Sequence, residues 1–332
     1  MRRAIKLLRE QSCSSLRKLA AMKIVFCCTN TKADPWLEGF RQALPGVDIW
    51  EWQATPAGQA PKLADHAVVW SPPQQFIDEQ TQLQNLFNIG AGVDALLKLN
   101  LPSSLNIVRL NDAGMSVQMA EYVCHAVIRH FREFDAYEAD IRAGKWSYRK
   151  PLERSDFPVG VMGLGVLGAR VAQSLAQFDF PVMGWSRSAK TLAGVRCFAG
   201  AAQFKDFLSA TRILVNLLPL TPETRDIMRL ETLSQLQSGG YVINVARGAQ
   251  LVDEDLLTLL DNGQLLGATL DVFRAEPLPS EHPFWHNPKI TITPHTSART
   301  LRDQSIAQIA GKIRALEAGH SIVGIVDRVR GY

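Results

Sequence analysis

The stretch Val159-Gly160-Val161-Met162-Gly163-Leu164-Gly165-Val166-Leu167-Gly168 decides the fold of this chain. An apolar run typical of a buried strand leads into a G-x-G-x-x-G turn, and residues 169–178 continue with a helical pattern. This order of strand, turn and helix is the context of a dinucleotide-binding fingerprint. Gly163 would permit the tight turn, Gly165 the approach of a pyrophosphate, and Gly168 close packing of the helix on its strand. We expect the pyrophosphate at the helix N-terminus, beside Val166 and Leu167.

The residues that would meet the adenosine ribose indicate which dinucleotide binds. An acidic residue usually lies about 20 residues beyond the glycines and accepts hydrogen bonds from the ribose. Here that window holds Ser186, Arg187 and Ser188, with no acid. A carboxylate would repel a 2′-phosphate, whereas a guanidinium can bind it with two hydrogen bonds. The sequence therefore favours NADP(H) over NAD(H), with Lys190 a second candidate for the phosphate contact.

Apolar runs that predict strands recur along the chain with helical segments between them. They lie at residues 23–28, 67–70, 85–88 and 106–109, and then at 159–162, 181–185, 213–217, 241–245, 268–273 and 290–293. Strands separated by helices indicate parallel sheets covered on both faces. We therefore expect an α/β protein with two Rossmann-like, doubly wound parallel-sheet domains and a cleft between them.

Two helical segments predict how the chain passes between the domains. Ser116 is a candidate N-cap for a long helix over residues 116–142, and residues 300–317 form a second helical pattern that ends before Gly319. Because few residues follow, we expect the second helix to return to the first group of strands. The predicted substrate domain is then residues 22–118 plus 295–332, and the predicted dinucleotide domain is 119–294. The stretch 144–158 looks too irregular for a helix or strand.

Composition limits the partners of the protein. Of the 332 residues, 46% are hydrophobic and 20% charged, which is typical of a globular protein. We find no uncharged apolar run of about 18 residues, the minimum for a membrane span. The whole chain has a net charge of +4. Residues 1–21 carry six basic side chains and one acid, Glu10, and so contribute +5, which leaves residues 22–332 with a net charge near −1. We therefore expect that residues 22–332 bind neither nucleic acid nor membrane.

The terminal segment and the cysteines are expected to carry no chemistry. Residues 1–21 are basic and contain serine, and we interpret them as an artefact of an upstream start or as a disordered or targeting extension. Five cysteines occur, without a spacing that suits a metal, so no metal site is expected. Cys27 and Cys28 fall on the first predicted strand and are interpreted as buried thiols of a reducing compartment. We therefore expect a cytoplasmic protein.

Three side chains of complementary chemistry follow successive strands of the second group. Arg247 follows the run 241–245, Glu276 follows 268–273, and His295 directly follows 290–293. A guanidinium at such a strand end could bind a carboxylate, and a histidine oriented by an acid could donate a proton to a reduced carbonyl oxygen. Taken singly, Arg247 fits a structural ion pair, Glu276 a solvated loop charge and His295 a surface histidine. Their order downstream of the fingerprint favours a catalytic site.

These motifs together resemble the D-isomer-specific 2-hydroxyacid dehydrogenases. The resemblance covers residues 22–332 and rests on the fingerprint, Asn244-Val245-Ala246-Arg247-Gly248, Asp271-Val272-Phe273-x-x-Glu276-Pro277-Leu278 and Thr293-Pro294-His295. Gly90-Ala91-Gly92-Val93-Asp94, Trp70-x-Pro72-Pro73, Phe198-Ala199-Gly200 and the ending Val326-Asp327-Arg328-x-Arg330-Gly331-Tyr332 resemble one subgroup, which reduces glyoxylate and hydroxypyruvate. The family often has His-Ile-Ala-Gly where this chain has His295-Thr296-Ser297-Ala298, so the wall behind the histidine is expected to differ.

The resemblance assigns roles to residues of this chain. It implies that Arg247 binds the substrate, that His295 is the acid/base and that Glu276 orients it. Backbone N–H groups near Gly92 and Val93 would hold the substrate carboxylate. The cofactor would be bound by the fingerprint residues and the ribose-contacting segment, with Asp271 beside the nicotinamide carboxamide; the other implied contacts are Leu218, Pro219, Ala246 and His295.

The activity implied by the resemblance is NADPH-dependent reduction of small 2-oxo acids, with glyoxylate and hydroxypyruvate as first candidates. Two alternatives stay open. One is a broader reductase of aliphatic or aromatic 2-oxo acids, because pocket size is not evident from the sequence. The other is a nucleotide-sensing binding protein, since some relatives with this fold are transcriptional corepressors. The resemblance also implies a homodimer joined through the nucleotide domain, with residues 144–158 as an intersubunit arm.

Overall fold

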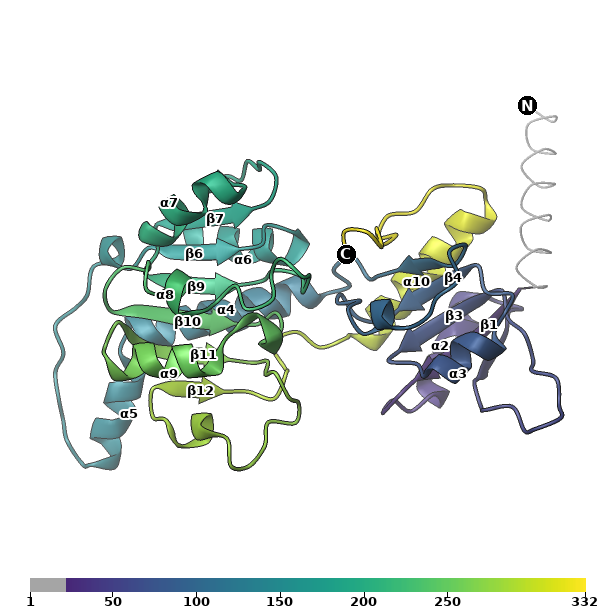
Figure 1. Cartoon of the computed structure of the whole chain (residues 1–332), viewed down its shortest axis with the longest axis horizontal. Coiled ribbons are helices and arrows are strands. Elements are labelled where there is room, and N and C mark those ends of the chain that lie inside the picture. The colour runs from purple at the N-terminus through teal and green to yellow at the C-terminus, as the bar shows by residue number, and fades with distance from the viewer. Residues whose placement is uncertain (1–21) are drawn as a thin grey trace. The chain divides into compact units, whose positions relative to one another are not determined.

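The chain divides into two compact units (Figure 1). The computed structural model describes residues 22–332, so the expectations for residues 1–21, including Cys13, lie outside the described residues. Unit 1 is Met1–Gly114 with Thr300–Tyr332, and unit 2 is Met115–Arg299. Unit 1 is therefore discontinuous in sequence.

Both boundaries differ from the predicted ones, which fell after residues 118 and 294. Helix α4 (Met115–Phe131) belongs to unit 2 from its first residue because it packs along α6 (Val166–Ala176). At the other boundary the backbone N–H of Arg299 donates to the side chain of Gln118, and the Gln118 amide donates back to the carbonyl of Arg299. His295 consequently lies in unit 2, not in the discontinuous unit to which the sequence assigned it.

Unit 2 is built on a seven-stranded sheet whose paired strands are all parallel. The strands are β6 (Val159–Met162), β7 (Val182–Ser186), β8 (Val195–Ala199), β9 (Ile213–Asn216), β10 (Gly240–Asn244), β11 (Leu265–Leu270) and β12 (Ile290–Ile292). Their order is β12-β11-β10-β9-β6-β7-β8. The chain leaves β6 toward one edge and returns to build the other, so the strand order reverses between β6 and β9. Open parallel sheets bind ligands beyond the carboxyl ends of the strands at such a reversal.

Helices cover both faces of this sheet. Successive side chains of a strand point to opposite faces. Val159 and Val161 pack with Val123 and Val171 of α4 and α6. Met162 and Leu214 pack instead on the face covered by α7 (Phe204–Ser209), α8 (Leu230–Leu233) and α9 (Asp253–Asp261). Both faces are therefore buried, which confirms the predicted doubly wound sheet.

The predicted single helix over residues 116–142 is wrong in two respects. The structure has two helices, α4 and α5 (Phe134–Arg142), because Glu133 between them adopts the left-handed conformation with φ +52°. The first helix begins at Met115, so Ser116 lies inside its first turn and is not the N-cap. After α5 the chain is irregular as predicted, apart from the 3-10 turn Arg154–Asp156.

Unit 1 contains a second parallel sheet. Its strands are β1 (Lys23–Cys28), β2 (Asp48–Glu51), β3 (His66–Trp70), β4 (Asn85–Asn88) and β5 (Asn106–Val108), in the order β2-β1-β3-β4-β5. The helices are α2 (Asp34–Ala43), α3 (Gln74–Glu79) and α10 (Arg302–Glu317), with a 3-10 turn at Leu96–Lys98. Helix α10 packs against α2, and the adjoining Gly319 has φ +76°. After unit 2 the chain thus returns to the unit that holds the first sheet.

Each apolar run predicted from the sequence overlaps a strand, whereas β2 and β8 were not predicted. Both are edge strands with mostly exposed or half-buried residues, so they lack the apolar runs of the central strands. Strand β11 also begins and ends three residues earlier than predicted, because residues 271–273 already form the following loop. Among the helices of residues 22–332, none is both long and apolar enough to span a bilayer.

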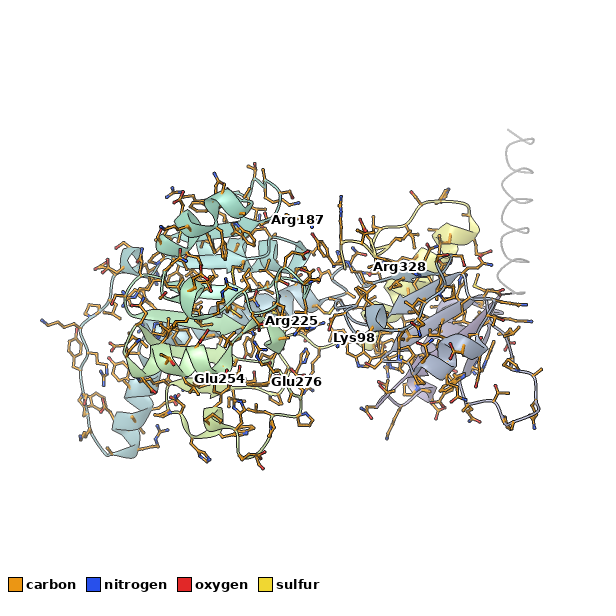
Figure 2. All side chains as sticks on the ribbon, in the orientation of Figure 1. Lys98, Arg187, Arg225, Glu254, Glu276 and Arg328 are labelled. Atoms are coloured by element: carbon orange, nitrogen blue, oxygen red, sulfur yellow. The ribbon has the colours of Figure 1, made fainter. Side chains whose placement is uncertain are left out.

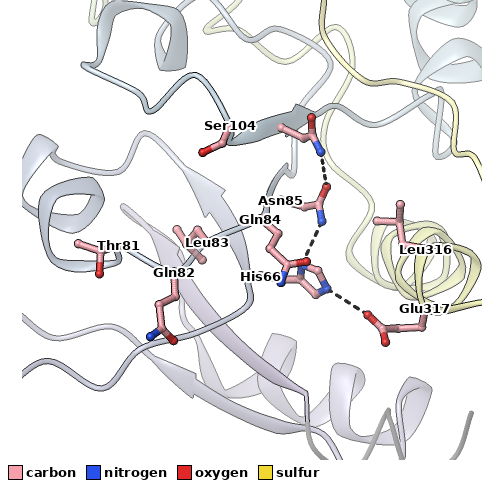
Figure 3. Close-up of a pocket in the computed structure, with 10 residues that line it drawn as sticks. His66, Thr81, Gln82, Leu83, Gln84, Asn85, Ser104, Leu316 and Glu317 are labelled. Carbon is pink, nitrogen blue, oxygen red and sulfur yellow. Dashed lines mark hydrogen bonds and ion pairs between the residues drawn. The ribbon is translucent and has the colours of Figure 1, made fainter. Parts of the chain in front are cut away.

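A polar cavity of about 490 Å³ lies at the amino ends of β3, β4 and β5 (Figure 3). His66, Asn85 and Asn106 begin these strands and form a row of hydrogen bonds. The Nε2 atom of His66 lies 3.8 Å from a carboxylate oxygen of Glu317, and burial lowers the pKa of this histidine. Gly92 and Val93 follow β4, so they lie beyond the opposite ends of these strands.

Candidate active site

The glycine turn after β6 has the geometry of a phosphate cradle. Gly163 has φ +98°, a value that favours glycine, and a Cβ there would lie 2.7 Å from the carbonyl oxygen of Leu217. A Cβ on Gly168 would lie 1.8 Å from the carbonyl oxygen of Gly163, so α6 packs directly on the turn. A Cβ on Gly165 would meet nothing within 4 Å. The first N–H groups of α6, at Val166 and Leu167, thus begin beside open space.

The segment after β7 carries the predicted ribose contacts. Ser186 is buried, and its hydroxyl donates to the carbonyl of Ser188, which fixes this turn. Arg187 is exposed between them. The pKa of Glu223 lies below its usual value, first because of a hydrogen bond from Thr221 and further because of the charge of Arg187. The charge of Arg187 therefore influences Glu223, which lies on the loop that follows β9.

Buried amide side chains shape the loops after β9 and β10. Asn216 donates to both Asn244 and Gln250, and the Gln250 amide donates to the carbonyls of Leu218 and Pro219. Asn244 in turn donates to the carbonyl of Arg247. All three amide side chains belong to fully buried residues. The network ties the predicted adenosine-side residues to the loop that carries Arg247.

Arg247 lies at the start of the 3-10 turn Gly248–Gln250. Its backbone N–H donates to the side chain of Gln250, and its guanidinium donates to the carbonyl of Ala246 at 2.7 Å. The next residue is in very close contact with the following loop: a Cβ on Gly248 would lie 1.8 Å from the carbonyl carbon of Phe273. The loop of Arg247 therefore packs directly on the loop that leads to Glu276.

Glu276 and His295 form a hydrogen-bonded ion pair. Nδ1 of His295 lies 2.8 Å from Oε2 of Glu276, and Oε1 of Glu276 accepts the backbone N–H of Phe273. The side chain of His295 is 45% exposed and that of Glu276 is 37% exposed, so the imidazole is accessible from solvent. An ionised carboxylate only accepts hydrogen bonds, so Nδ1 carries a hydrogen and Nε2 is the nitrogen left to exchange a proton. Figure 2 shows Glu276 along the same edge of unit 2 as Arg187 and Arg225.

The charges of the site raise the pKa of the histidine. The hydrogen bond that His295 donates to Glu276 raises the pKa of the histidine above its ordinary value, against opposing effects of burial and of Arg247. Burial would raise the pKa of Glu276, but the hydrogen bonds from His295 and Phe273 outweigh it and the pKa is lowered. Because the charge of Arg247 affects both groups, its guanidinium lies within electrostatic reach of the pair. The structure thus pairs Glu276 with His295 and places Arg247 within electrostatic range of both.

Asp271 organises the loop that carries His295. Its fully buried carboxylate accepts hydrogen bonds from the hydroxyl of Thr293 and from the backbone N–H groups of Thr296 and Ser297. His295 itself has φ +53°, and its N–H donates to the Asp271 carbonyl. Left-handed backbone is uncommon for a residue other than glycine, so Asp271 holds the histidine in a conformation that needs support. Sequence reasoning missed this contact.

Gly92 and Val93 belong to unit 1, where an amide shapes their loop. The side chain of Asn88, the last residue of β4, donates to the carbonyls of Gly90 and Gly92. The carbonyl of Val93 accepts the N–H of Leu97. Asn88 and the buried amides of unit 2 were not assigned roles from the sequence. Asn88, Asn216 and Asn244 are each the last residue of a buried strand, and a polar amide at that position is the sequence signal that could have identified them. Gln250 has no such position.

Comparison with known proteins points to one family. The family model described as "D-isomer specific 2-hydroxyacid dehydrogenase, NAD binding domain" matches residues 124–297. A protein of Yersinia enterocolitica named glyoxylate/hydroxypyruvate reductase A is 44% identical over 317 residues, which cover 94% of this chain and 100% of the relative. One of the same name from Serratia proteamaculans is 45% identical over the same shares.

Solved structures agree with this assignment. A D-isomer specific 2-hydroxyacid dehydrogenase from Xanthobacter autotrophicus in complex with NADPH is 39% identical, with a TM-score of 0.88 over 94% of this chain and 99% of that one. An NADPH-dependent glyoxylate/hydroxypyruvate reductase from Sinorhizobium meliloti, in complex with NADP and sulfate, is 35% identical, with a TM-score of 0.87 over 94% and 100%.

Proposed function

This chain belongs to the D-isomer-specific 2-hydroxyacid dehydrogenases, and from that membership we propose that it reduces small 2-oxo acids with NADPH, glyoxylate and hydroxypyruvate first. The observation that carries the proposal is the Glu276–His295 hydrogen bond beside Arg247, at strand ends of the unit that holds the glycine turn. The names of the relatives from Yersinia and Serratia support these two substrates.

The residues of unit 2 fit a dinucleotide. The open space at Gly165 beside the first N–H groups of α6 suits a pyrophosphate, and no acidic side chain occurs among Ser186, Arg187 and Ser188. Leu218 and Pro219 would line the adenosine side, and Ala246 with Asp271 the nicotinamide side. The bound cofactor would supply a hydride equivalent to the substrate carbonyl carbon.

The protein's own groups would bind the substrate and provide a proton. Arg247 would hold the substrate carboxylate together with backbone N–H groups near Gly92 and Val93. Nε2 of His295 would protonate the carbonyl oxygen as negative charge develops on it, while Glu276 fixes the ring through Nδ1. Correct positioning of two reactants is worth on the order of 7–11 kcal/mol, and acid catalysis roughly 10²–10⁴-fold in rate.

A substrate panel tests the proposal. NADPH oxidation would be followed with glyoxylate, hydroxypyruvate, pyruvate and phenylpyruvate, and repeated with NADH. We expect the largest kcat/KM for one of the two smallest substrates with NADPH. A larger kcat/KM with phenylpyruvate would favour a broader reductase, and NADPH binding without turnover of any of the four would contradict the proposal.

Replacing Arg187 by aspartate is expected to move the cofactor preference toward NADH. The new carboxylate would repel a 2′-phosphate and could accept hydrogen bonds from ribose hydroxyls. We expect the kcat/KM for NADPH relative to NADH to fall at least about 10-fold, the equivalent of losing one charged hydrogen bond of roughly 1.5 kcal/mol. The matched variant Lys190→Asp should leave the ratio much closer to wild type. The reverse ranking of the two variants would transfer the phosphate contact to Lys190.

We further propose a homodimer joined through unit 2. Trp146 is fully exposed, and Ile141 and Tyr148 are 74% and 85% exposed on the same stretch of chain. Helix α5, which leads into this stretch, has no buried residue. Large aromatic side chains are enriched at protein interfaces, so a second copy of this unit would cover them.

Trp146→Glu is expected to weaken that dimer. A central aromatic contact is typically worth at least about 2 kcal/mol, so the dissociation constant should rise about 30-fold. Sedimentation equilibrium over a range of concentrations measures it. Val329→Glu is the matched control, because Val329 is 99% exposed but lies in unit 1. A wild-type protein that stays monomeric at high concentration would refute the proposed dimer.

We place the protein in the cytoplasm. Cys27, Cys28, Cys124 and Cys197 are free thiols, and burial raises the pKa of Cys27 to about 12 and that of Cys124 to about 11. Such buried thiols suit a reducing compartment. Recovery of the native protein in a periplasmic fraction would contradict this location.

A further inference from the structure

Arg274 connects three loops that follow neighbouring strands of unit 2. It stands between Phe273 and Glu276 on the loop after β11. Its Nε donates to the carbonyl of Leu251 at 2.6 Å, beyond the turn that begins at Arg247. Its guanidinium also forms an ion pair with Asp226, on the loop after β9. One side chain therefore binds the loops after β9 and β10 from the loop after β11.

Asp226 is itself attached to the middle loop. Its N–H donates to the carbonyl of Ala249 at 3.1 Å, and two residues later Met228 donates to the carbonyl of Gln250. Asp226 has φ +54°, so this backbone turns sharply to present its carboxylate. The backbone of Asp226 is thus held against the turn Gly248–Gln250, and its carboxylate binds Arg274 from that position.

The peptide next to Arg274 separates the proposed catalytic groups. On one side it presses on Gly248, where a Cβ would lie 2.4 Å from the nitrogen of Arg274. The peptide on the other side of Phe273, which joins it to Val272, carries the N–H that donates to Oε1 of Glu276, and Oε2 of Glu276 binds His295. The path from Arg247 to the imidazole thus runs through Gly248, the two peptides that flank Phe273, and Glu276. A shift of these peptides would move the acid/base pair relative to the guanidinium of Arg247.

We propose that Arg274 and Asp226 form a positioning pair that sets the separation between Arg247 and the Glu276–His295 pair. The expected effects on kcat rest on the proposed function. Neither residue touches the reacting groups in this role. Their ion pair is more than a third exposed on the Asp226 side and about a third exposed on the other, so its direct contribution to stability is small. Its effect is expected on geometry, because a displacement of about 1 Å can lower a rate up to 10²-fold.

The test compares three variants: Arg274→Met, Asp226→Asn and the double variant. Methionine keeps a long apolar side chain at position 274 and removes the guanidinium. Arg274→Lys tests rescue, and Arg229→Met is the matched control, because Arg229 forms an exposed ion pair with Glu231 in the same unit. Circular dichroism verifies folding and NADPH fluorescence gives the cofactor Kd. Kinetics give kcat, KM and the pH profile, and NMR gives the pKa of His295, whose signal is identified by its loss in His295→Ala.

For Arg274→Met we expect kcat to fall about 10-fold or more, with KM and the cofactor Kd little changed. The pKa of His295 should fall toward its ordinary value because its contact with Glu276 loosens, and the alkaline limb of kcat should follow it. Asp226→Asn should act in the same direction, the double variant should be no worse than Arg274→Met, and lysine should restore part of the rate. The control should resemble wild type.

Two results would overturn the proposal. One is an unchanged His295 pKa in folded Arg274→Met, which needs no turnover to be measured. The other is additivity of the two single variants, since a coupled pair is not additive. Absence of turnover in the wild-type protein would instead contradict the proposed function, and the NMR titration would still decide the role of Arg274.

Discussion

His295→Ala is expected to lower kcat for 2-oxo acid reduction by roughly 10²–10⁴-fold while leaving the Kd for NADPH near the wild-type value. Nε2 of this ring is the proton donor in the proposed reaction, because Nδ1 is already bound to Glu276. The contacts that shape the glycine turn lie elsewhere in unit 2 and do not involve this side chain. Steady-state kinetics and cofactor titration measure the two quantities separately.

The control for this variant is His286→Ala, which removes an exposed histidine of the same unit. It should retain wild-type kcat. A His295→Ala enzyme with kcat within about 10-fold of wild type would contradict the acid role, since acid catalysis contributes at least roughly 10²-fold. Equal losses of kcat and of NADPH affinity would also contradict it, because they would assign the histidine to cofactor binding.

The pH dependence of the reaction follows from the same contact. The hydrogen bond that His295 donates to Glu276 raises the pKa of the histidine, so the proton-donating form persists to higher pH than in a free histidine. The rate of reduction should therefore be constant at low pH and fall as pH rises through this raised value. In Glu276→Gln the pKa of His295 drops, so the fall should begin at lower pH.

The central part of both sheets was predictable because burial leaves a strong pattern. Strands β1, β4 and β6 coincide with their predicted apolar runs, and the turn after β6 is readable because only glycine tolerates its close contacts. The edge strands β2 and β8 were not predictable, since half-exposed residues carry no such run. The break after Phe131 depends on one left-handed residue, Glu133, which the helical spacing of the sequence does not reveal.

The candidate site divides in the same way. Arg247, Glu276 and His295 could be singled out from the sequence because each follows a strand and has distinctive chemistry, and their catalytic roles stay predictions. The groups that hold them could not be identified in that role: Asp271 was assigned to the cofactor, yet its carboxylate accepts three hydrogen bonds from the loop of His295. Arg274 occupies a position without a motif, and its contacts join segments separated by 23 and 48 residues. Such long-range hydrogen bonds leave no local signal in the sequence.

Arg247→Lys is expected to lower kcat/KM for small 2-oxo acids by about 10²-fold. A planar guanidinium offers two parallel donors to a carboxylate, whereas an ammonium group is a point charge on a flexible stem. Lysine keeps the positive charge, so its effect on the pKa of His295 should persist and the alkaline limb of the pH profile should stay in place. The expected result is therefore a lower rate at every pH with an unchanged profile.

Arg212→Lys is the matched control for this substitution. Arg212 also binds backbone carbonyls, those of Asp156 and Gly239, but it precedes β9 and so lies at the amino ends of the strands, away from the ligand edge. Its loss should reduce thermal stability and leave kcat/KM nearly intact. If Arg247→Lys retained wild-type kcat/KM, the guanidinium would not bind the substrate carboxylate. If it shifted the alkaline limb instead, the position of the guanidinium would influence the pKa of His295, because the variant conserves the charge.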